Sequence, residues 1–168
     1  PMSAGLYTDG KDRAARLNLC RTVTSVSYVD KNGITNLIYR YTDADGTSHY
    51  FLPTTTSGVY ADEDGLLLTM TFADGSTDIL ITDAGGNRIR FSDIASLGNL
   101  WYLIAYEDED GNRLTVSYTN EQPTELAFIP RGQNVGYDKI TVTYDEVWRP
   151  VTLTGSRGDT VTLTYNAG

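Results

Sequence analysis

Apolar and polar residues alternate strictly in several stretches of this chain. Residues 114–118 read Leu-Thr-Val-Ser-Tyr, residues 140–144 read Ile-Thr-Val-Thr-Tyr, and residues 161–165 read Val-Thr-Leu-Thr-Tyr. Successive side chains of an extended strand point to opposite faces, so a period of two is typical of strands with one buried face. The pattern predicts an all-β protein.

A six-residue motif, Tyr-x-Asp-x-Asp/Asn-Gly, recurs between the alternating stretches. Its clear copies span residues 28–33, 41–46, 60–65 and 106–111, and looser copies span residues 81–86 and 153–158. Asp-Gly and Asn-Gly between two strands favour a hairpin turn, because both residues tolerate a positive φ. We therefore predict structural turn residues at the closing glycines, which are Gly33, Gly46, Gly65, Gly86, Gly111 and Gly158.

The spacing of these glycines predicts how the hairpins follow one another. The interval from Gly111 to Gly158 is about twice the others, so we expect a degenerate unit near Gly136. Consecutive hairpins form an antiparallel meander, and the predicted fold is a meandering, curved sheet of hairpin repeats. We divide the chain into an N-terminal arm or partial unit, residues 1–22, and a repeat domain, residues 23–168.

Two segments interrupt the alternation. Residues 11–20 include Arg-Ala-Ala-Arg-Leu, which predicts a short helix or an irregular arm. Residues 92–98 predict one helical turn, with Ser92 as its cap and Gly98 as its stop.

Composition and charge narrow the possible partners. The chain carries 12 Tyr, 16 Gly and a net charge of −9, and such an acidic surface repels phosphate backbones, which argues against nucleic acid. Cys20 is the single cysteine, so an internal disulfide cannot form. No apolar run of transmembrane length and no signal peptide is present, so we expect no membrane insertion. The leading Pro1 points to a piece excised from a longer protein.

Residues suited to catalysis or metal binding are scarce. A Ser-His-Asp or Cys-His arrangement would need His49, the single histidine, which lies on an alternating stretch as an ordinary strand residue would. The acidic clusters at the turns resemble calcium loops, but a tyrosine stands where the first aspartate ligand belongs. No feature selects two of the 22 acidic residues as a glycosidase pair. We therefore expect no enzyme activity, cofactor or metal.

Residues 144–158, followed by Tyr165 and Asn166, resemble an RHS (YD) repeat. The family pattern begins Tyr-Asp, two residues, Gly-Arg-Leu, and ends in a strand that closes with Tyr-Asp or Tyr-Asn. Here Trp148 stands at the family's Gly, Pro150 at its Leu and Gly155 at its Asp. Residues 103–112 match a second unit, and residues 41–65 are similar to the segment that opens the array in wall-associated RHS proteins. The resemblance covers about residues 23–168.

The resemblance implies a structural role. In the family, a long antiparallel sheet spirals into a hollow shell that encloses a toxic C-terminal domain. By this resemblance the chain would be a non-catalytic scaffold of a secreted or cell-surface protein. Its partners would be neighbouring repeats and an enclosed effector. The last strand, residues 161–165, lacks the Lys or Pro that protects a sheet edge, so we expect a further repeat to pair with it.

A second hypothesis is a carbohydrate- or cell-surface-binding β module that shares hairpin repeats by convergence. Trp101, Tyr102 and Trp148 could form a sugar-binding platform, although such residues more often pack in a core. Exposed aromatic residues on one sheet face would favour this module, and a curved sheet with open ends would favour the scaffold.

Overall fold

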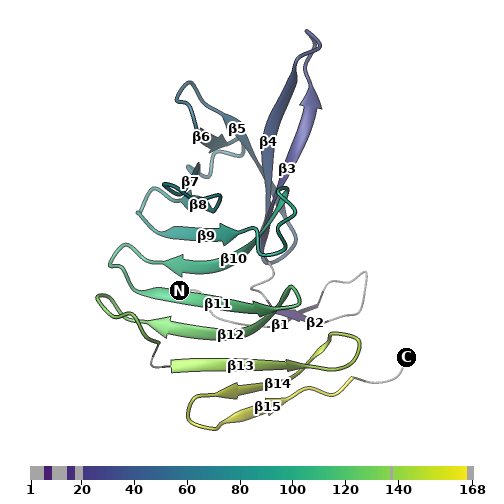
Figure 1. Ribbon diagram of the computed structural model, residues 1–168, viewed down its shortest axis with the longest axis vertical. Coiled ribbons are helices and arrows are strands. Elements are labelled where there is room, and N and C mark those ends of the chain that lie inside the picture. The colour runs from purple at the N-terminus through teal and green to yellow at the C-terminus, as the bar shows by residue number, and fades with distance from the viewer. Residues whose placement is uncertain (1–5, 9–14, 18–20, 137, 166–168) are drawn as a thin grey trace.

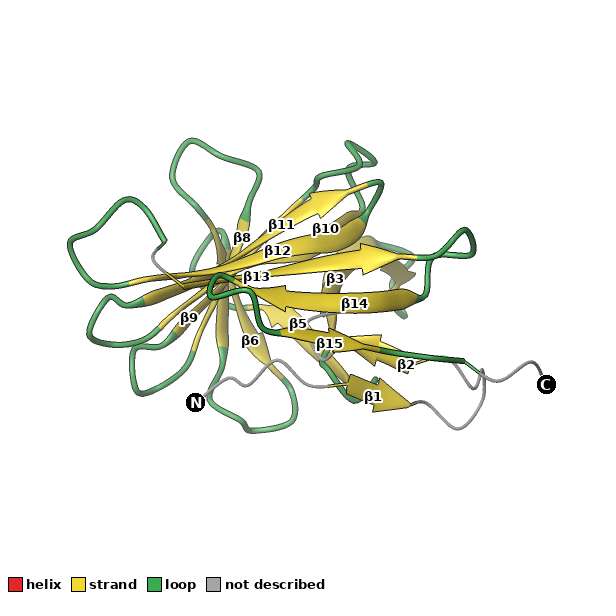
Figure 2. Ribbon diagram, turned by 90° about the horizontal axis from the view of Figure 1, so that it is seen from below, coloured by secondary structure: helices red, strands yellow, loops and turns green. Residues whose placement is uncertain are grey.

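The computed structural model describes residues 6–8, 15–17, 21–136 and 138–165, and within these ranges every regular element is a β-strand (Figure 2). All strand pairs are antiparallel. The all-β, antiparallel prediction is therefore confirmed. The strands are β1 Leu6–Thr8, β2 Ala15–Leu17, β3 Thr22–Val29, β4 Thr35–Thr42, β5 Ser48–Pro53, β6 Val59–Asp62, β7 Thr69–Phe72, β8 Ile79–Thr82, β9 Arg88–Ser92, β10 Leu100–Glu107, β11 Arg113–Thr119, β12 Gln122–Ile129, β13 Asp138–Tyr144, β14 Pro150–Gly155 and β15 Thr160–Thr162.

The sheet closes on itself, which corrects the prediction of an open meander. Strands β3 to β9 pair in sequence, and β10 then pairs with β9 along one edge and with β3 along the other, through Val23 opposite Trp101. These eight strands form a barrel. Alternation assigns each residue to a face but does not say which distant strand will pair with the free edge of β3, so closure was not foreseen.

Side chains fill the interior of the barrel. Trp101 is 5% exposed, and its indole N–H donates a hydrogen bond to the carbonyl of Thr77 at 3.0 Å. Tyr39 packs against Tyr60, Phe72 and Trp101 with its ring edge-on, an arrangement that aromatic rings favour. The largest fully buried side chains of this core are Phe51, Phe91, Met70, Ile79, Ile81, Leu103 and Val23.

Strands β11 to β15 form an array of hairpins that continues from the barrel wall. The first residues of β10 pair with β3, and its last residues, Ala105 to Glu107, pair with β11 instead. From β11 onward each strand pairs with the next, as Figure 1 shows in the lower half of the molecule. One face of the array buries Val116, Leu126 and Val142. This part of the sheet has the predicted meander.

Of the two segments that interrupt the alternation, the first is described only at residues 15–17, and at the second the predicted helical turn is wrong. Residues 15–17 form β2, which pairs with β1, and Cys20 lies outside the described residues. At residues 92–98 no helical turn forms. Asp93 accepts hydrogen bonds from the backbone N–H groups of Leu97 and Gly98 at 2.9 and 2.6 Å, which closes a loop. The predicted cap, Ser92, is the last residue of β9.

Candidate functional site: the hairpin turns and the open sheet edge

The six predicted turn glycines all have a positive φ, from +75° at Gly65 to +90° at Gly86. In the first turn the N–H of Asp30 donates to the carbonyl of Ile34 at 2.9 Å, and the N–H of Gly33 donates to the carbonyl of Asp30 at 3.0 Å. The same two bonds recur in the turns that begin at Asp43, Asp83 and Asp108. Within the described residues, the Asp or Asn before each glycine does not share its positive φ. The turn is thus a four-residue Asp-x-x-Gly loop in which only the closing glycine adopts the positive φ.

The first aspartate of each motif stabilises its own turn. A carboxylate oxygen of Asp30 accepts from the N–H groups of Asn32 and Ile34, both at 2.9 Å, and the bond from Ile34 lowers the pKa of Asp30. At Asp108 the side-chain amide of Asn112 takes this role and likewise lowers the carboxyl pKa. These oxygens are therefore occupied by turn amides. No group of three or more His, Cys, Asp or Glu in the described ranges is arranged to hold a metal ion.

One later turn keeps this geometry with another residue in place of the glycine, and a second uses a different glycine. Trp148 has φ +61°, and its N–H donates to the carbonyl of Asp145 at 3.0 Å, so a tryptophan occupies the conformation that glycine has elsewhere. Near the expected degenerate unit, the turn glycine is Gly132, with φ +74°, and not Gly136. A Cβ at Gly136 would lie 2.8 Å from the Cβ of Ala127, so this glycine permits close approach to β12 instead.

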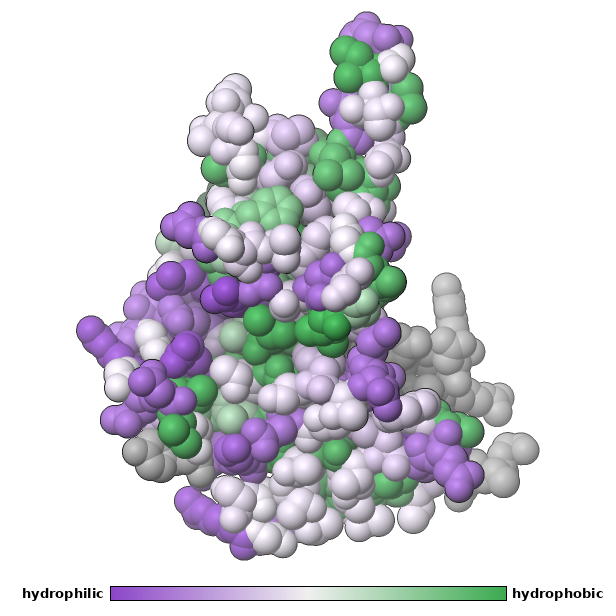
Figure 3. All heavy atoms as spheres, in the orientation of Figure 1, coloured by the Kyte–Doolittle hydropathy of each residue, from purple (hydrophilic) through white to green (hydrophobic). Residues whose placement is uncertain are grey.

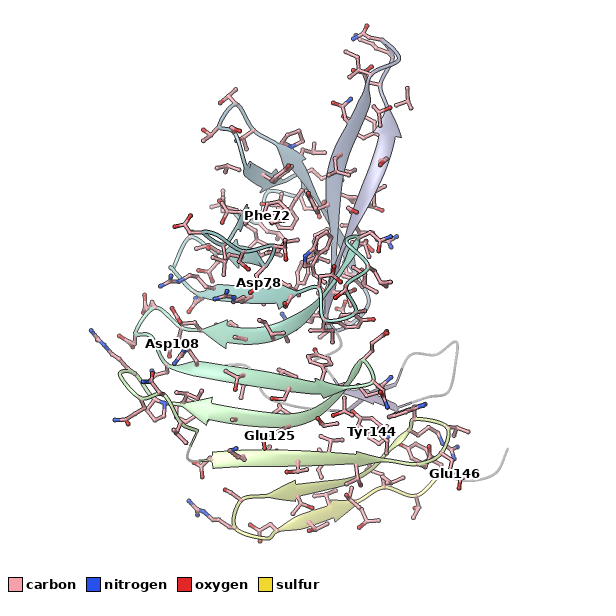
Figure 4. All side chains as sticks on the ribbon, in the orientation of Figure 1. Phe72, Asp78, Asp108, Glu125, Tyr144 and Glu146 are labelled. Carbon is pink, nitrogen blue, oxygen red and sulfur yellow. The ribbon has the colours of Figure 1, made fainter. Side chains whose placement is uncertain are left out.

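Three tyrosines bond across neighbouring strands of the array. The hydroxyl of Tyr118 donates to the carbonyl of Leu103 at 2.6 Å, and that of Tyr144 donates to the carbonyl of Pro123 at 2.6 Å. The hydroxyl of Tyr165 donates to the carbonyl of Pro150 at 2.8 Å. In each case the acceptor lies on the preceding strand, which is β10, β12 or β14. Figure 4 shows Tyr144 where β13 ends. We call these three bonds the tyrosine links.

Two of the three links begin at a local irregularity of the sheet. The β11–β12 register shifts between Ser117 and Tyr118, which places Tyr118 opposite Pro123. The β13–β14 register shifts in the same way and places Tyr144 opposite Pro150. The proline that faces one tyrosine therefore offers its carbonyl to the next tyrosine. Sequence reasoning missed this repeat, although a Tyr followed five or six residues later by Pro was its visible signal.

The array ends at β15, which pairs with β14 and has no second strand neighbour among the described residues. Leu153 lies opposite Val161, on the same face as Val142. Val142 is 3% exposed, whereas Val161 is 59% exposed. This face is thus buried at β13 and exposed at β15. The outer edge of β15 has no neighbouring strand among the described residues, as the sequence predicted for the last strand.

His49 lies between two of the acidic turns. Its Nε2 is 3.2 Å from Asp43, its Nδ1 is 3.0 Å from Asp64, and its ring stacks on Tyr41. Burial of the ring opposes protonation, but the hydrogen bonds to the two carboxylates outweigh it and raise the pKa of His49. Since ionised carboxylates only accept hydrogen bonds, the imidazolium form satisfies both contacts. His49 therefore ties the β4–β5 turn to the loop after β6.

The aromatic residues considered for sugar binding do not form one platform. Trp101 is in the barrel core, Tyr102 donates from its hydroxyl to Glu121 at 2.7 Å on the outer wall, and Trp148 is 47% exposed in the β13–β14 turn. A groove of about 350 Å³ does cross the outer wall, lined by residues that include Arg88, Arg90 and Glu107. Arg88 pairs with Glu107 at 2.9 Å and Arg90 with Asp78 at 2.7 Å, so acidic neighbours already balance these two cations.

In comparisons with known proteins, no family model and no curated protein matches the chain. No helix that could span a membrane is found in the part of the chain that the structure describes.

Proposed function

We propose that this chain is a non-catalytic structural segment of an exported RHS/YD-repeat protein. In this proposal it forms part of a β-shell that would encase or present a C-terminal effector. The observation that carries it is the series of tyrosine links, because the same tyrosine-to-carbonyl bond recurs along the array, from β11 to β10, from β13 to β12 and from Tyr165 to β14. A repeated bond of this kind is what a wall assembled from nearest-neighbour units requires.

The two ends of the sheet support this role in different ways. The barrel has no free edge along β10, because β9 and β3 flank that strand. At the other end β15 presents three exposed residues and an unpaired edge. A sheet that begins as a closed ring and ends in an exposed strand can receive further hairpins at that strand. Neighbouring repeats are then the first partners of the chain, and secretion or attachment to a cell surface follows from the same proposal.

The tyrosine links also favour a scaffold over an enzyme. The polar groups that recur along the array are used internally, as turn caps at Asp108 and Asp145 and as donors at Tyr144 and Tyr165. Residues used in this way hold neighbouring units in register. We propose that chemistry, where the parent protein has any, belongs to other domains.

The test is to extend the chain at its C-terminus by the next native segment. We expect a rise in the free energy of unfolding and a single cooperative transition, because a new hairpin buries Val161 and pairs with β15. The control is an extension of equal length made of Gly and Ser, which stays a flexible coil and leaves stability unchanged. No gain from the native extension, together with saturable binding of a glycan, would replace this proposal by the carbohydrate-binding module.

A further inference from the structure

The hairpin formed by β3 and β4 projects from the barrel as a free-standing arm (Figure 1). We define the arm as residues 26–38. Strand β3 pairs with β10 only from Thr22 to Thr24, and β4 pairs with β5 only from Tyr39 to Thr42. Along the arm the two strands therefore have each other and, within the described residues, no further strand on either side.

The arm also exposes apolar side chains. Val29 is 65% exposed and Leu37 is 43% exposed on one face, while Tyr28 is 42% exposed on the other. Ile34, beside the tip, is 59% exposed. Figure 3 shows hydrophobic side chains, in green, along the arm at the top of the view. An isolated two-stranded hairpin is marginally stable in water, and exposed apolar residues on an unpaired strand favour pairing with another strand.

Charge distinguishes the arm from the rest of the molecule. Its two charged residues, Asp30 and Lys31, cancel, so the net charge of −9 lies entirely outside it. Two copies that met through their acidic bodies would repel each other. Contact through the arms avoids this repulsion and keeps the bodies apart, because the arm extends beyond the barrel (Figure 1).

We propose that the arm is a dimerisation element that pairs with the same arm of a second copy of this chain. The free edge of β3 aligns antiparallel with its counterpart about Ser27, so that Ser27 faces Ser27 of the second copy, which turns two ribbons into one four-stranded sheet. Figure 1 favours β3 over β4 as the contact, because the β5–β6 hairpin rises on the β4 side whereas the β3 side is open. Symmetric pairing of identical strands closes on itself, so a dimer and not a fibre results.

The test measures the molar mass of the protein in solution by analytical ultracentrifugation over a range of concentrations. We expect a monomer–dimer equilibrium that Val29→Lys shifts to monomer, because a charge is placed on the pairing strand. The matched control is Val135→Lys, since Val135 is 69% exposed in a loop away from the arm, and this variant should still dimerise. Circular dichroism of both variants verifies that the fold is retained.

A second measurement locates the contact. In a Cys20→Ser background, Ser27→Cys should form an intermolecular disulfide under mild oxidation, because residues opposite each other in paired strands approach within about 5.5 Å. Ser156→Cys, in the β14–β15 turn, should not. The proposal is overturned if the protein is monomeric at every concentration. It is overturned equally if Val161→Lys on β15, and not Val29→Lys, abolishes the dimer, since the open edge of the array would then be the contact.

Discussion

In the barrel, strands β3 to β10 form a ring, whereas β11 to β15 form a row that ends at an unpaired edge. The ring buries Phe51 and Phe91 completely, and the row leaves Val161 59% exposed on the face where Val142 is 3% exposed. Both regions are built of antiparallel hairpins, and the two backbone bonds of the turn that begins at Asp30 recur in the row at residues 145–149 and 155–159. The difference shows that closure of the ring, and not the hairpin repeat itself, lets part of this sheet bury its core without further strands.

The largest test of this comparison removes one large side chain from each region. Phe91→Ala should lower the free energy of unfolding by about 3–5 kcal/mol, because a fully buried aromatic ring leaves a cavity in a closed core. Val161→Ala at the open edge should cost less than about 0.5 kcal/mol, as exposed positions do. Chemical denaturation of both variants measures the difference. Equal losses would mean that the edge is as well packed as the ring.

A turn substitution tests whether the two regions share one turn geometry. Gly111, with φ +88°, joins β10 of the barrel to β11 of the array, and Gly111→Val should cost about 1–3 kcal/mol because a branched side chain is strained there. The reciprocal change, Trp148→Gly, places glycine at φ +61° and should cause no such loss. Thermal unfolding compares the two, and a Gly111→Val variant as stable as the parent would contradict the turn assignment.

The tyrosine links provide a smaller test within the array. Tyr144→Phe removes the hydroxyl bonded to Pro123 and should lower the free energy of unfolding by about 1 kcal/mol. Tyr28→Phe, on the exposed arm, is the matched control and should change it by less than about 0.5 kcal/mol. Denaturant titrations at low protein concentration keep any association of the arms out of the comparison. If both hydroxyls prove equally dispensable, the links do not hold the array.

The smallest expected effect is a pH dependence at the end of the barrel. The pKa of His49 is raised in the folded protein by Asp43 and Asp64, so its contribution to stability is complete below the unfolded pKa of about 6.5. That contribution is lost as pH rises through the higher folded pKa, and it should amount to less than about 1 kcal/mol. His49→Gln should flatten this part of the stability curve. Titration of the His49 ring by NMR checks the direction, and a folded pKa below that of the unfolded chain would contradict it.

Part of this architecture could be predicted from the sequence because it is encoded locally. Alternation at residues 114–118 and 140–144 gives strands, and Asp followed by Gly gives turns, so the positive φ values of Gly33 and Gly111 lie where the motif predicted. The Asp or Asn before the glycine was expected to tolerate a positive φ, but it does not adopt one. The first aspartate, Asp30 or Asp108, in fact accepts the turn amides.

The remaining features depend on contacts between distant residues. Pairing of Val23 with Trp101 closes the barrel, and nothing within either strand marks the other as its neighbour. The His49 cluster arises because β5 lies between β4 and β6, so that the turn after β4 and the loop after β6 both reach His49, which requires knowledge of three paired strands. The repeated Tyr and Pro positions behind the tyrosine links are visible in the sequence. Which proline faces which tyrosine depends on a register shift, and the sequence does not show it.

The pairing of β10 with β3 also determines the order in which the chain can fold during synthesis. When β3 to β9 have been made, the edge of β3 that β10 will occupy has no partner, because β10 follows β9 in the chain. Closing the ring joins segments that are far apart in the sequence, which is a slow step compared with forming one hairpin. The array can then grow by local additions, each hairpin joining a template that already exists. The residues up to Glu107 are therefore the slow part of the molecule, and the interval before their closure is when the unpaired edge of β3 is open to aggregation.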